Sequence, residues 1–144
     1  MNISRKDIYS YVASLFTSIT KNIYRIKIPE TFNSDILANG FILLTLDDMK
    51  DHSEFSLETY AGTRMTVEYY IPSSKVGDVS GIMNTTKFDN AQQTVDNIVL
   101  AECAKSNQTY SISKDDILSS DDYYSNGSNS FFTYITSFII TITD

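Results

Sequence analysis

The stretch Leu57–Ile71, LETYAGTRMTVEYYI, determines the fold prediction. Its odd positions include Met65, Val67 and Tyr69, whereas its even positions are mostly charged, hydroxylated or tyrosine. Alternation with a period of two residues is typical of a β-strand with one dry face and one wetter face. We therefore predict a long central strand, with a bulge or bend at Gly62. A strand of this length needs neighbouring strands and a cover of helices.

Composition narrows the classes of protein to consider. The chain has 144 residues, of which 42% are apolar and 20% charged, as is typical of one globular domain with a single core. The net charge is −7, and the 11 Lys and Arg residues are scattered along the chain. A protein that binds a groove of duplex DNA needs a clustered basic patch. We therefore expect one domain spanning residues 1–144 that does not bind nucleic acid specifically.

Cysteine and histidine content excludes two further kinds of site. Cys103 is the single cysteine and His52 the single histidine, so neither an internal disulfide nor a Cys/His zinc site is expected. The N-terminal segment has basic residues, but an aspartate follows at once and Ser and Thr interrupt its apolar run. We therefore expect no export signal, no transmembrane helix and no membrane association.

Two segments show the apolar spacing of helices. Ser4–Thr20 begins with a capping serine, and 87–105 follows the start signal of Thr86 and Asp89. The two apolar stripes consist of Ile8, Val12, Leu15, Phe16 and Ile19 in the first helix and Phe88, Ala91, Val95, Ile98 and Val99 in the second.

Four further segments read as strands. Tyr24–Pro29 alternates and is expected to point Ile26 and Ile28 inward, whereas the apolar run Phe41–Leu46 is typical of a strand buried on both faces. Residues 108–113 form a short strand, and residues 131–143 a long one. The predicted order is helix, three strands, helix, two strands. This order predicts an α+β fold with a mainly antiparallel sheet and two helices packed on one face.

The predicted core lies where the helical stripes meet the inward strand positions. We expect these side chains to be largely buried: Val12, Phe16, Ile26, Val67, Tyr69, Val95 and Ile98.

The connections between these elements include long loops. Residues 30–40 are predicted as a loop that ends at Gly40, where the chain enters the next strand tightly. Residues 72–86 and 114–130 are predicted as two long loops. The first carries four large apolar residues that a solvated loop does not need, so they either return to the core or meet another subunit.

The residues available for catalysis are few. The acidic pairs Asp47-Asp48, Asp115-Asp116 and Asp121-Asp122 lack the spacing of a calcium-binding loop, and we interpret them as solvated charge. His52 lies beside Ser53 and Glu54, but contiguity in a loop is not the geometry of a catalytic triad. We predict no enzyme and no catalytic, cofactor-binding or metal-binding residue. The alternative is a metal- or small-molecule-binding enzyme that uses the acidic loop at 115–122.

Surface chemistry favours an assembly component instead. The chain has 10 tyrosines, and aromatic residues with a polar group are enriched at protein interfaces. With both helices on one face of the sheet, apolar residues on its second face are predicted to contact another subunit. The predicted interface residues on strands and loops are Tyr60, Tyr70, Val76, Val79, Ile82, Met83, Tyr123, Tyr124, Phe131, Ile135 and Ile139.

The order of elements and three segments resemble the tail-terminator and head–tail connector (neck ring) proteins of tailed bacteriophages. The segments are the strand end Ile26–Pro29, the strand Arg64–Ile71 within the run TVEYYIP, and the strand Phe138–Ile142. The resemblance covers nearly the whole chain as a pattern of elements. The composition, rich in Asn, Asp, Ile and Tyr, is similar to that of proteins from phages with AT-rich genomes, such as the crAss-like group.

The resemblance implies a structural virion protein, made in the host bacterial cytoplasm, that forms a homo-oligomeric ring at the neck or tail. It implies a portal-side or adaptor ring on one side, tail proteins on the other, and genomic DNA that passes through without specific binding. An acidic chain suits passage of DNA, because it repels phosphate. The remaining alternative is a non-viral oligomeric binding module.

Overall fold

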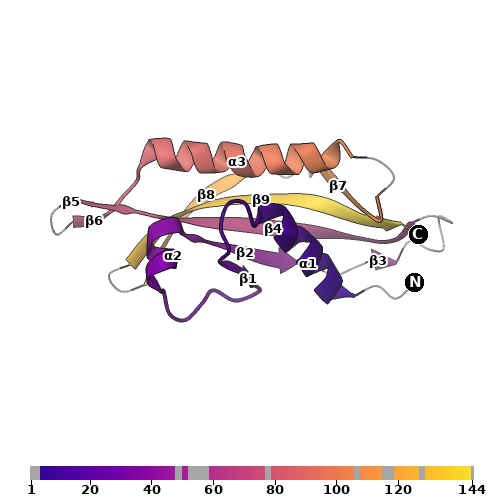
Figure 1. Ribbon diagram of the computed structural model, residues 1–144, viewed down its shortest axis with the longest axis horizontal. Helices are drawn as coiled ribbons and strands as arrows, with labels where there is room; N and C mark the ends of the chain where they lie inside the picture. The colour runs from indigo at the N-terminus through magenta and orange to yellow at the C-terminus, as the bar shows by residue number, and fades with distance from the viewer. Residues whose placement is uncertain are drawn as a thin grey trace.

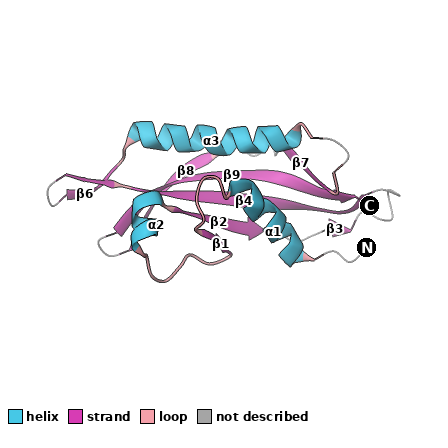
Figure 2. Ribbon diagram, viewed as in Figure 1, coloured by secondary structure: helices cyan, strands magenta, loops and turns pink. Residues whose placement is uncertain are grey.

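The computed structural model describes residues 4–47, 50–51, 59–76, 79–105, 108–114, 119–126 and 129–143. It shows an α+β fold, as predicted, in which two helices cover a mainly antiparallel sheet (Figures 1 and 2). The elements are α1 (Arg5–Phe16), β1 (Ile23–Arg25), α2 (Ser34–Asn39), β2 (Phe41–Leu46), β3 (Lys50–Asp51), β4 (Thr59–Pro72), β5 (Ser74–Val76), β6 (Val79–Ile82), α3 (Thr85–Cys103), β7 (Tyr110–Lys114), β8 (Ser120–Asn126) and β9 (Asn129–Thr143).

The ladder between β4 and β9 forms the middle of the main sheet. These strands have 14 and 15 residues and pair antiparallel from end to end. The strand order is β1-β2-β4-β9-β7, while β8 also pairs with β9 and β3 with β4. β1 runs parallel to β2, and the other described pairs are antiparallel. The register shifts between Thr59 and Ala61, close to the bulge predicted at Gly62.

The first face of the sheet packs against α1 and α3 and holds the main core. Ser4 caps α1 as predicted, accepting from the Asp7 backbone amide, whereas α3 begins earlier than predicted, at the N-cap Asn84. Alternate residues of β4, such as Met65 and Val67, point toward the helices. The buried members of this first cluster are Ile8, Tyr9, Val12, Phe16, Ile42, Leu44, Leu46, Met65, Val67, Tyr69, Ile71, Phe88, Val95, Val99, Ile112, Tyr134, Phe138, Ile140 and Ile142. Five of the seven predicted core residues are among them, and Ile98 packs against the cluster while partly buried.

The prediction for Ile26 is wrong. Its side chain is 70% exposed, because β1 ends at Arg25 and Ile26 adopts a φ of 70°. The Ile26 amide donates to the Leu44 carbonyl at 2.9 Å, and the Lys27 amide donates to the Arg25 carbonyl at 2.7 Å. The second bond, between residues two positions apart, together with the positive φ defines a γ-turn centred on Ile26, which strains a β-branched residue. The turn redirects the chain, so that Ile28 packs on the second face of the sheet.

Three predicted loops contain regular structure. The segment 30–40 includes α2, which begins at the N-cap Asn33, and Gly40 follows it with a φ of 80° at the predicted tight entry into β2. The segment 72–86 forms the hairpin β5–β6, which extends beyond one end of the main sheet (Figure 1). The segment 114–130 contains β8, which continues into β9 as a second hairpin.

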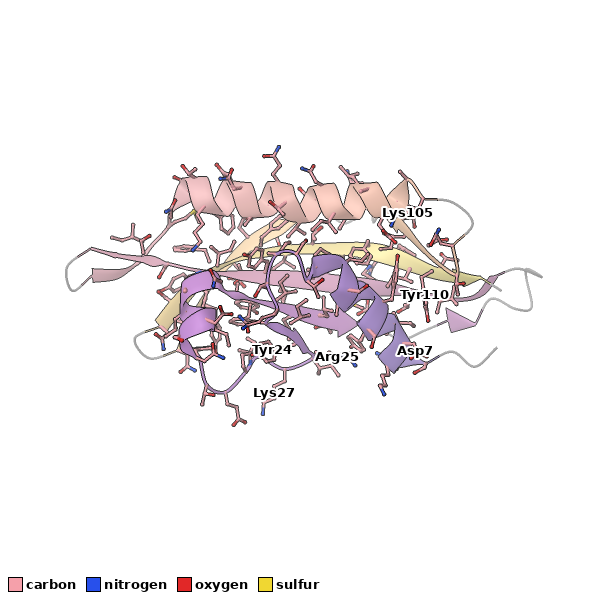
Figure 3. All side chains as sticks on the ribbon, in the orientation of Figure 1. Asp7, Tyr24, Arg25, Lys27, Lys105 and Tyr110 are labelled. Atoms are coloured by element: carbon pink, nitrogen blue, oxygen red, sulfur yellow. The ribbon has the colours of Figure 1, made fainter. Side chains whose placement is uncertain are left out.

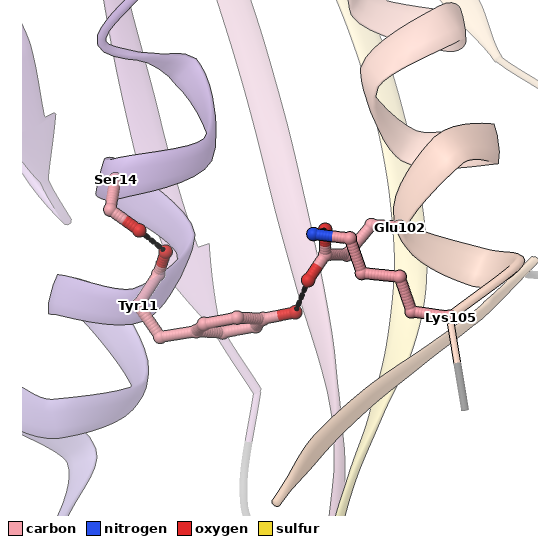
Figure 4. Close-up of polar contacts among 4 residues, drawn as sticks. All are labelled: Tyr11, Ser14, Glu102 and Lys105. Carbon is pink, nitrogen blue, oxygen red and sulfur yellow. Dashed lines mark hydrogen bonds and ion pairs between the residues drawn. The ribbon is translucent and has the colours of Figure 1, made fainter. Parts of the chain in front are cut away.

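A polar bridge joins α1 to α3 over the first face (Figure 4). The Tyr11 hydroxyl donates to Glu102 Oε1 at 2.6 Å, and Lys105 Nζ lies 2.9 Å from Glu102 Oε2. Figure 3 shows Lys105 and Tyr110 at the same end of the molecule, where the Tyr110 ring stacks on Tyr11 at 4.8 Å between centroids. Burial alone would raise the pKa of Glu102, but the bond from Tyr11 and the contact with Lys105 hold it below its usual value. The buried carboxylate is therefore a structural link between the helices.

Replacing Val95 by aspartate tests the packing of α3. Val95 is fully buried, so Val95→Asp places an unpaired carboxylate in the core and is expected to cost about 3–5 kcal/mol of unfolding free energy. The measurement is chemical denaturation followed by circular dichroism. The matched control is Leu100→Asp, because Leu100 on the same helix is exposed and the same charge there stays in water. Equal midpoints for the two variants would contradict this packing.

A second substitution tests the close approach at Gly40. A Cβ on Gly40 would lie 2.1 Å from the Tyr70 carbonyl oxygen, so Gly40→Ala must move the backbone as well as strain it. We expect a loss of roughly 1–3 kcal/mol or more in unfolding free energy. Gly81 also has a positive φ, but a Cβ there would meet the Tyr123 hydroxyl at 3.1 Å, which is the end of a flexible side chain. Gly81→Ala should therefore lower the urea midpoint less than Gly40→Ala does.

Candidate functional site

The second face of the sheet is divided into a covered half and an open half. The covered half lies under α2 and the segment that leads to it, where Ile36 shares a buried cluster with residues of β2, β4 and β9. Phe41 and Tyr70 stack there with 4.4 Å between ring centroids. The buried side chains of this second cluster are Ile36, Phe41, Leu43, Tyr70 and Phe131, with Tyr24, Ile28, Phe32 and Tyr124 packed against them.

Two residues of the predicted interface are therefore enclosed by their own chain. Tyr70 is 6% exposed and Phe131 is fully buried, so neither presents the open apolar surface that we predicted. The prediction missed α2, which covers them. Its signals are present in the sequence: Asn33 accepts from the Ile36 amide as an N-cap, and Gly40 ends the helix.

The open half presents a surface of six residues that we call the open face: Arg64, Thr66 and Glu68 of β4, and Ile135, Ser137 and Ile139 of β9. All six side chains are partly exposed. Arg64 lies opposite Ile139, Thr66 opposite Ser137, and Glu68 opposite Ile135. The structure thus places the predicted interface residues Ile135 and Ile139 on one surface with a basic side chain, Arg64, and an acidic one, Glu68.

Glu68 is the electrostatically unusual member of the open face. Partial burial raises the pKa of Glu68 even though the Tyr70 hydroxyl donates to its Oε2 at 3.1 Å, and the negative charge of Asp122 raises that pKa further. Burial and the neighbouring Glu68 carboxylate also raise the pKa of the Tyr70 hydroxyl. Ionised Glu68 therefore costs folding free energy at neutral pH.

The hairpin β5–β6, which we call the arm, contains three of the predicted interface residues, and a fourth follows it. The side chains of Val76 and Val79 lie outside the described residues, and so does that of Tyr60 in β4. Ile82 is 39% exposed, whereas Met83 packs against the first cluster. The arm therefore exposes Ile82 to solvent, while Met83 packs against the core.

The two tyrosines of β8 point to opposite faces. Tyr123 is 48% exposed, and its ring lies 5.2 Å from that of Phe132, tilted by 58°. Tyr124 packs into the second cluster beside Phe131. Of this predicted interface pair, Tyr123 is the one whose ring is open to solvent.

The acidic pairs were the alternative candidate for a metal or substrate site. Asp121 Oδ1 accepts from Gln92 Nε2 at 2.8 Å, and Asp122 Oδ1 accepts from the Tyr123 amide at 2.7 Å. His52, Asp48 and the pair at 115–116 lie outside the described residues. Among residues that the structure describes, no three His, Cys, Asp or Glu side chains are grouped to hold a metal ion. The enzyme that uses the acidic loop therefore stays a prediction.

Comparisons with protein families and with curated proteins identify no relative of this chain. None of the helices in the described part of the chain combines the length and apolarity that a membrane span requires. The features that bear on function are therefore the open face, the arm and the exposed ring of Tyr123.

The raised pKa of Glu68 predicts how stability depends on pH. Because the folded state binds the Glu68 proton more tightly than the unfolded chain does, the contribution of Glu68 to stability is fully present below its unfolded-state pKa of about 4.3 and is lost as pH rises through its raised folded-state pKa. Glu68→Gln removes this loss and still accepts the Tyr70 hydrogen bond. We expect a higher melting temperature at pH 7 and no gain below about pH 4.

The control for this measurement is Glu30→Gln, because Glu30 forms a solvent-exposed pair with Lys27. Its melting temperature should stay close to that of the wild type at every pH. A Glu68→Gln protein that melts below the wild type at pH 7 would show that ionised Glu68 stabilises the fold.

Proposed function

We propose that the chain is a structural, non-enzymatic subunit of a ring at the head–tail junction of a tailed bacteriophage. In this role it joins a portal-side or adaptor ring to tail components around the DNA channel. It is made in the host cytoplasm and ends in the virion neck or tail.

One observation supports the proposal most. Two of the segments that resemble the tail-terminator and neck-ring family, Arg64–Ile71 and Phe138–Ile142, belong to the two strands that pair along the middle of the sheet. Both long helices lie on the other side from the open face. One side covered by helices and one open side suit a subunit that stacks between two different neighbours.

The open face and the arm are the surfaces that would contact those neighbours. The open face offers the side chains of Ile135 and Ile139, and the arm offers Ile82 beyond the end of the main sheet (Figure 1). Apolar side chains rimmed by polar ones are characteristic of protein interfaces.

The charge of the chain supports passage of DNA rather than its capture. The net charge is −7, and several described cations bind groups of their own chain. Arg5 donates to the carbonyls of Leu46 and Asp47, and Arg64 lies 3.8 Å from an Asp47 carboxylate oxygen. DNA that meets an acidic wall slides past it, because few phosphates are neutralised.

Co-expression tests this function directly. The chain would be produced together with the products of the genes that flank its own, and complexes would be purified and imaged by negative-stain electron microscopy. We expect annular particles that contain the chain and a portal-side or tail protein. Flanking genes for metabolic enzymes, or no complex with any flanking product, would contradict the proposal.

A matched pair of variants links this assembly to the arm. Ile82→Asp places a charge on the exposed arm residue, and Leu100→Asp places one on the outer side of α3. Both variants should fold, as judged by circular dichroism. We expect Ile82→Asp to lower incorporation into the particles about tenfold or more, and Leu100→Asp to leave it unchanged.

A further inference from the structure

The two edges of the sheet are built from parts of the chain with opposite charge. Residues 1–46 contain five Lys and Arg against three Asp and Glu, whereas residues 47–144 contain six against fifteen. The first part forms β1 and β2, which end the sheet on one side, and the second part forms β7 and β8, which end it on the other. The second part also forms β3, which lies on the β2 side of β4, so the charge of each edge depends on the residues of the edge strands themselves.

The β1 edge is the basic one. Arg25 is the last residue of β1, Lys21 precedes the strand and Lys27 follows it, and all three side chains are exposed. Figure 3 shows Arg25 and Lys27 at this margin, with Lys27 pointing away from the body of the protein. Both side chains of the Lys27–Glu30 ion pair are exposed, so water and salt screen their attraction and the pair restrains Lys27 only weakly.

The β8 edge is the acidic one. The strand pairs with β9 along its whole length, and among the described strands β9 is its only partner. Asp121 and Asp122 are exposed on it. An edge strand with exposed side chains and two adjacent aspartates is suited to a partner that carries basic residues.

Each edge also carries one exposed apolar anchor. Ile26 on the β1 edge is 70% exposed, and its strained γ-turn holds it there. Tyr123 on the β8 edge is 48% exposed, and its position is set by Phe132 beneath it and by Gly81 of the arm beside its hydroxyl. An apolar centre surrounded by charge is the usual anatomy of a binding hot spot. A strained backbone that exposes an apolar residue indicates a function for that residue.

We propose that the β1 edge of one copy docks on the β8 edge of a second copy, with Ile26 against Tyr123 and the basic residues facing Asp121 and Asp122. The two edges differ, so each copy keeps one edge free for the next, and the contact repeats head to tail. Such a contact produces a closed ring when the rotation between neighbouring copies divides a full turn into a whole number of steps. The inference names the contact between subunits of the proposed ring and rests on the proposed function only for that closure.

Charge reversal on the isolated chain tests the docking. The concentration dependence of mass would be measured by light scattering from micromolar to millimolar protein at low salt. Lys27→Glu and Asp122→Lys should each weaken self-association roughly tenfold or more, and the double variant should restore it. The two single variants mixed together should also associate, in alternation, because each then meets a complementary edge.

Ile26→Gly separates docking from folding. Glycine adopts a φ of 70° without strain, so the melting temperature should rise, whereas self-association should fall at least tenfold because the anchor is lost. A purely structural residue would not give these opposite effects. The control is Leu100→Ala, which removes an exposed apolar side chain of α3 that belongs to neither edge strand and should leave association unchanged.

The outcomes separate this inference from the proposed function. A wild-type chain that stays monomeric over the whole range overturns the docking, and so does association that neither charge reversal nor Ile26→Gly weakens. Annular particles with the flanking gene products would then still support the ring function. Docking that behaves as expected without any such particles would leave a self-assembling protein and remove the phage role.

Discussion

The antiparallel ladder between β4 and β9 is the interaction on which the other elements depend. Its register places Val67 and Phe138 on one face and Glu68 and Ile139 on the other, so a shift of one residue would exchange core and surface along both strands. The helices α1 and α3 cover the first face because the apolar positions of both strands gather there. β2 extends the ladder on one side, and β7 and β8 extend it on the other. The open face and both edges of the main sheet are therefore set by this one pairing.

The turn at Ile26 divides the second face. Without it, β1 would continue along β2, and the residues that follow would extend the sheet rather than cross it. The turn instead brings Ile28 and Phe32 over Phe41 and Phe131, where α2 completes the cover. One strained residue thereby decides which half of the face is dry and which half is left to solvent. Aromatic contacts beneath the segment that follows the turn offset the strain. The ring centroids of Phe32 and Phe131, for example, lie 5.1 Å apart.

The sequence predicts the fold where the pattern is long. Periodicity in β4, β9, α1 and α3 identifies the α+β class and most of the core, because a wrong assignment there would bury many polar groups. It fails at short elements: α2 has six residues and the arm strands three and four, too few for a period to appear. Ile26 is missed because alternation continues through it while a pair of backbone hydrogen bonds turns the chain. For the candidate site, the sequence correctly predicts that Ile135, Ile139 and Tyr123 are at least partly exposed, and it wrongly predicts the same for Tyr70 and Phe131. The sequence signals of α2 indicate a short helix, but they do not show which strands that helix covers.

The position of β9 has a consequence for how the protein folds. This strand pairs with β4, β7 and β8. Until it docks, β7 lacks the partner that the structure describes for it, and β4, which pairs with β2 and β3 on its other side, keeps one edge open. Its pairing with β4 joins segments separated by the arm, by α3 and by β7 and β8, so a large loop must close before the contact forms. The helices and the β8–β9 hairpin depend on contacts between residues close in sequence, so we expect them to form early. Docking of this hairpin on β4 is then expected to be the slow step. During that delay the unpaired edge of β4 is open to other chains, and crowding or fast synthesis would favour aggregation over folding.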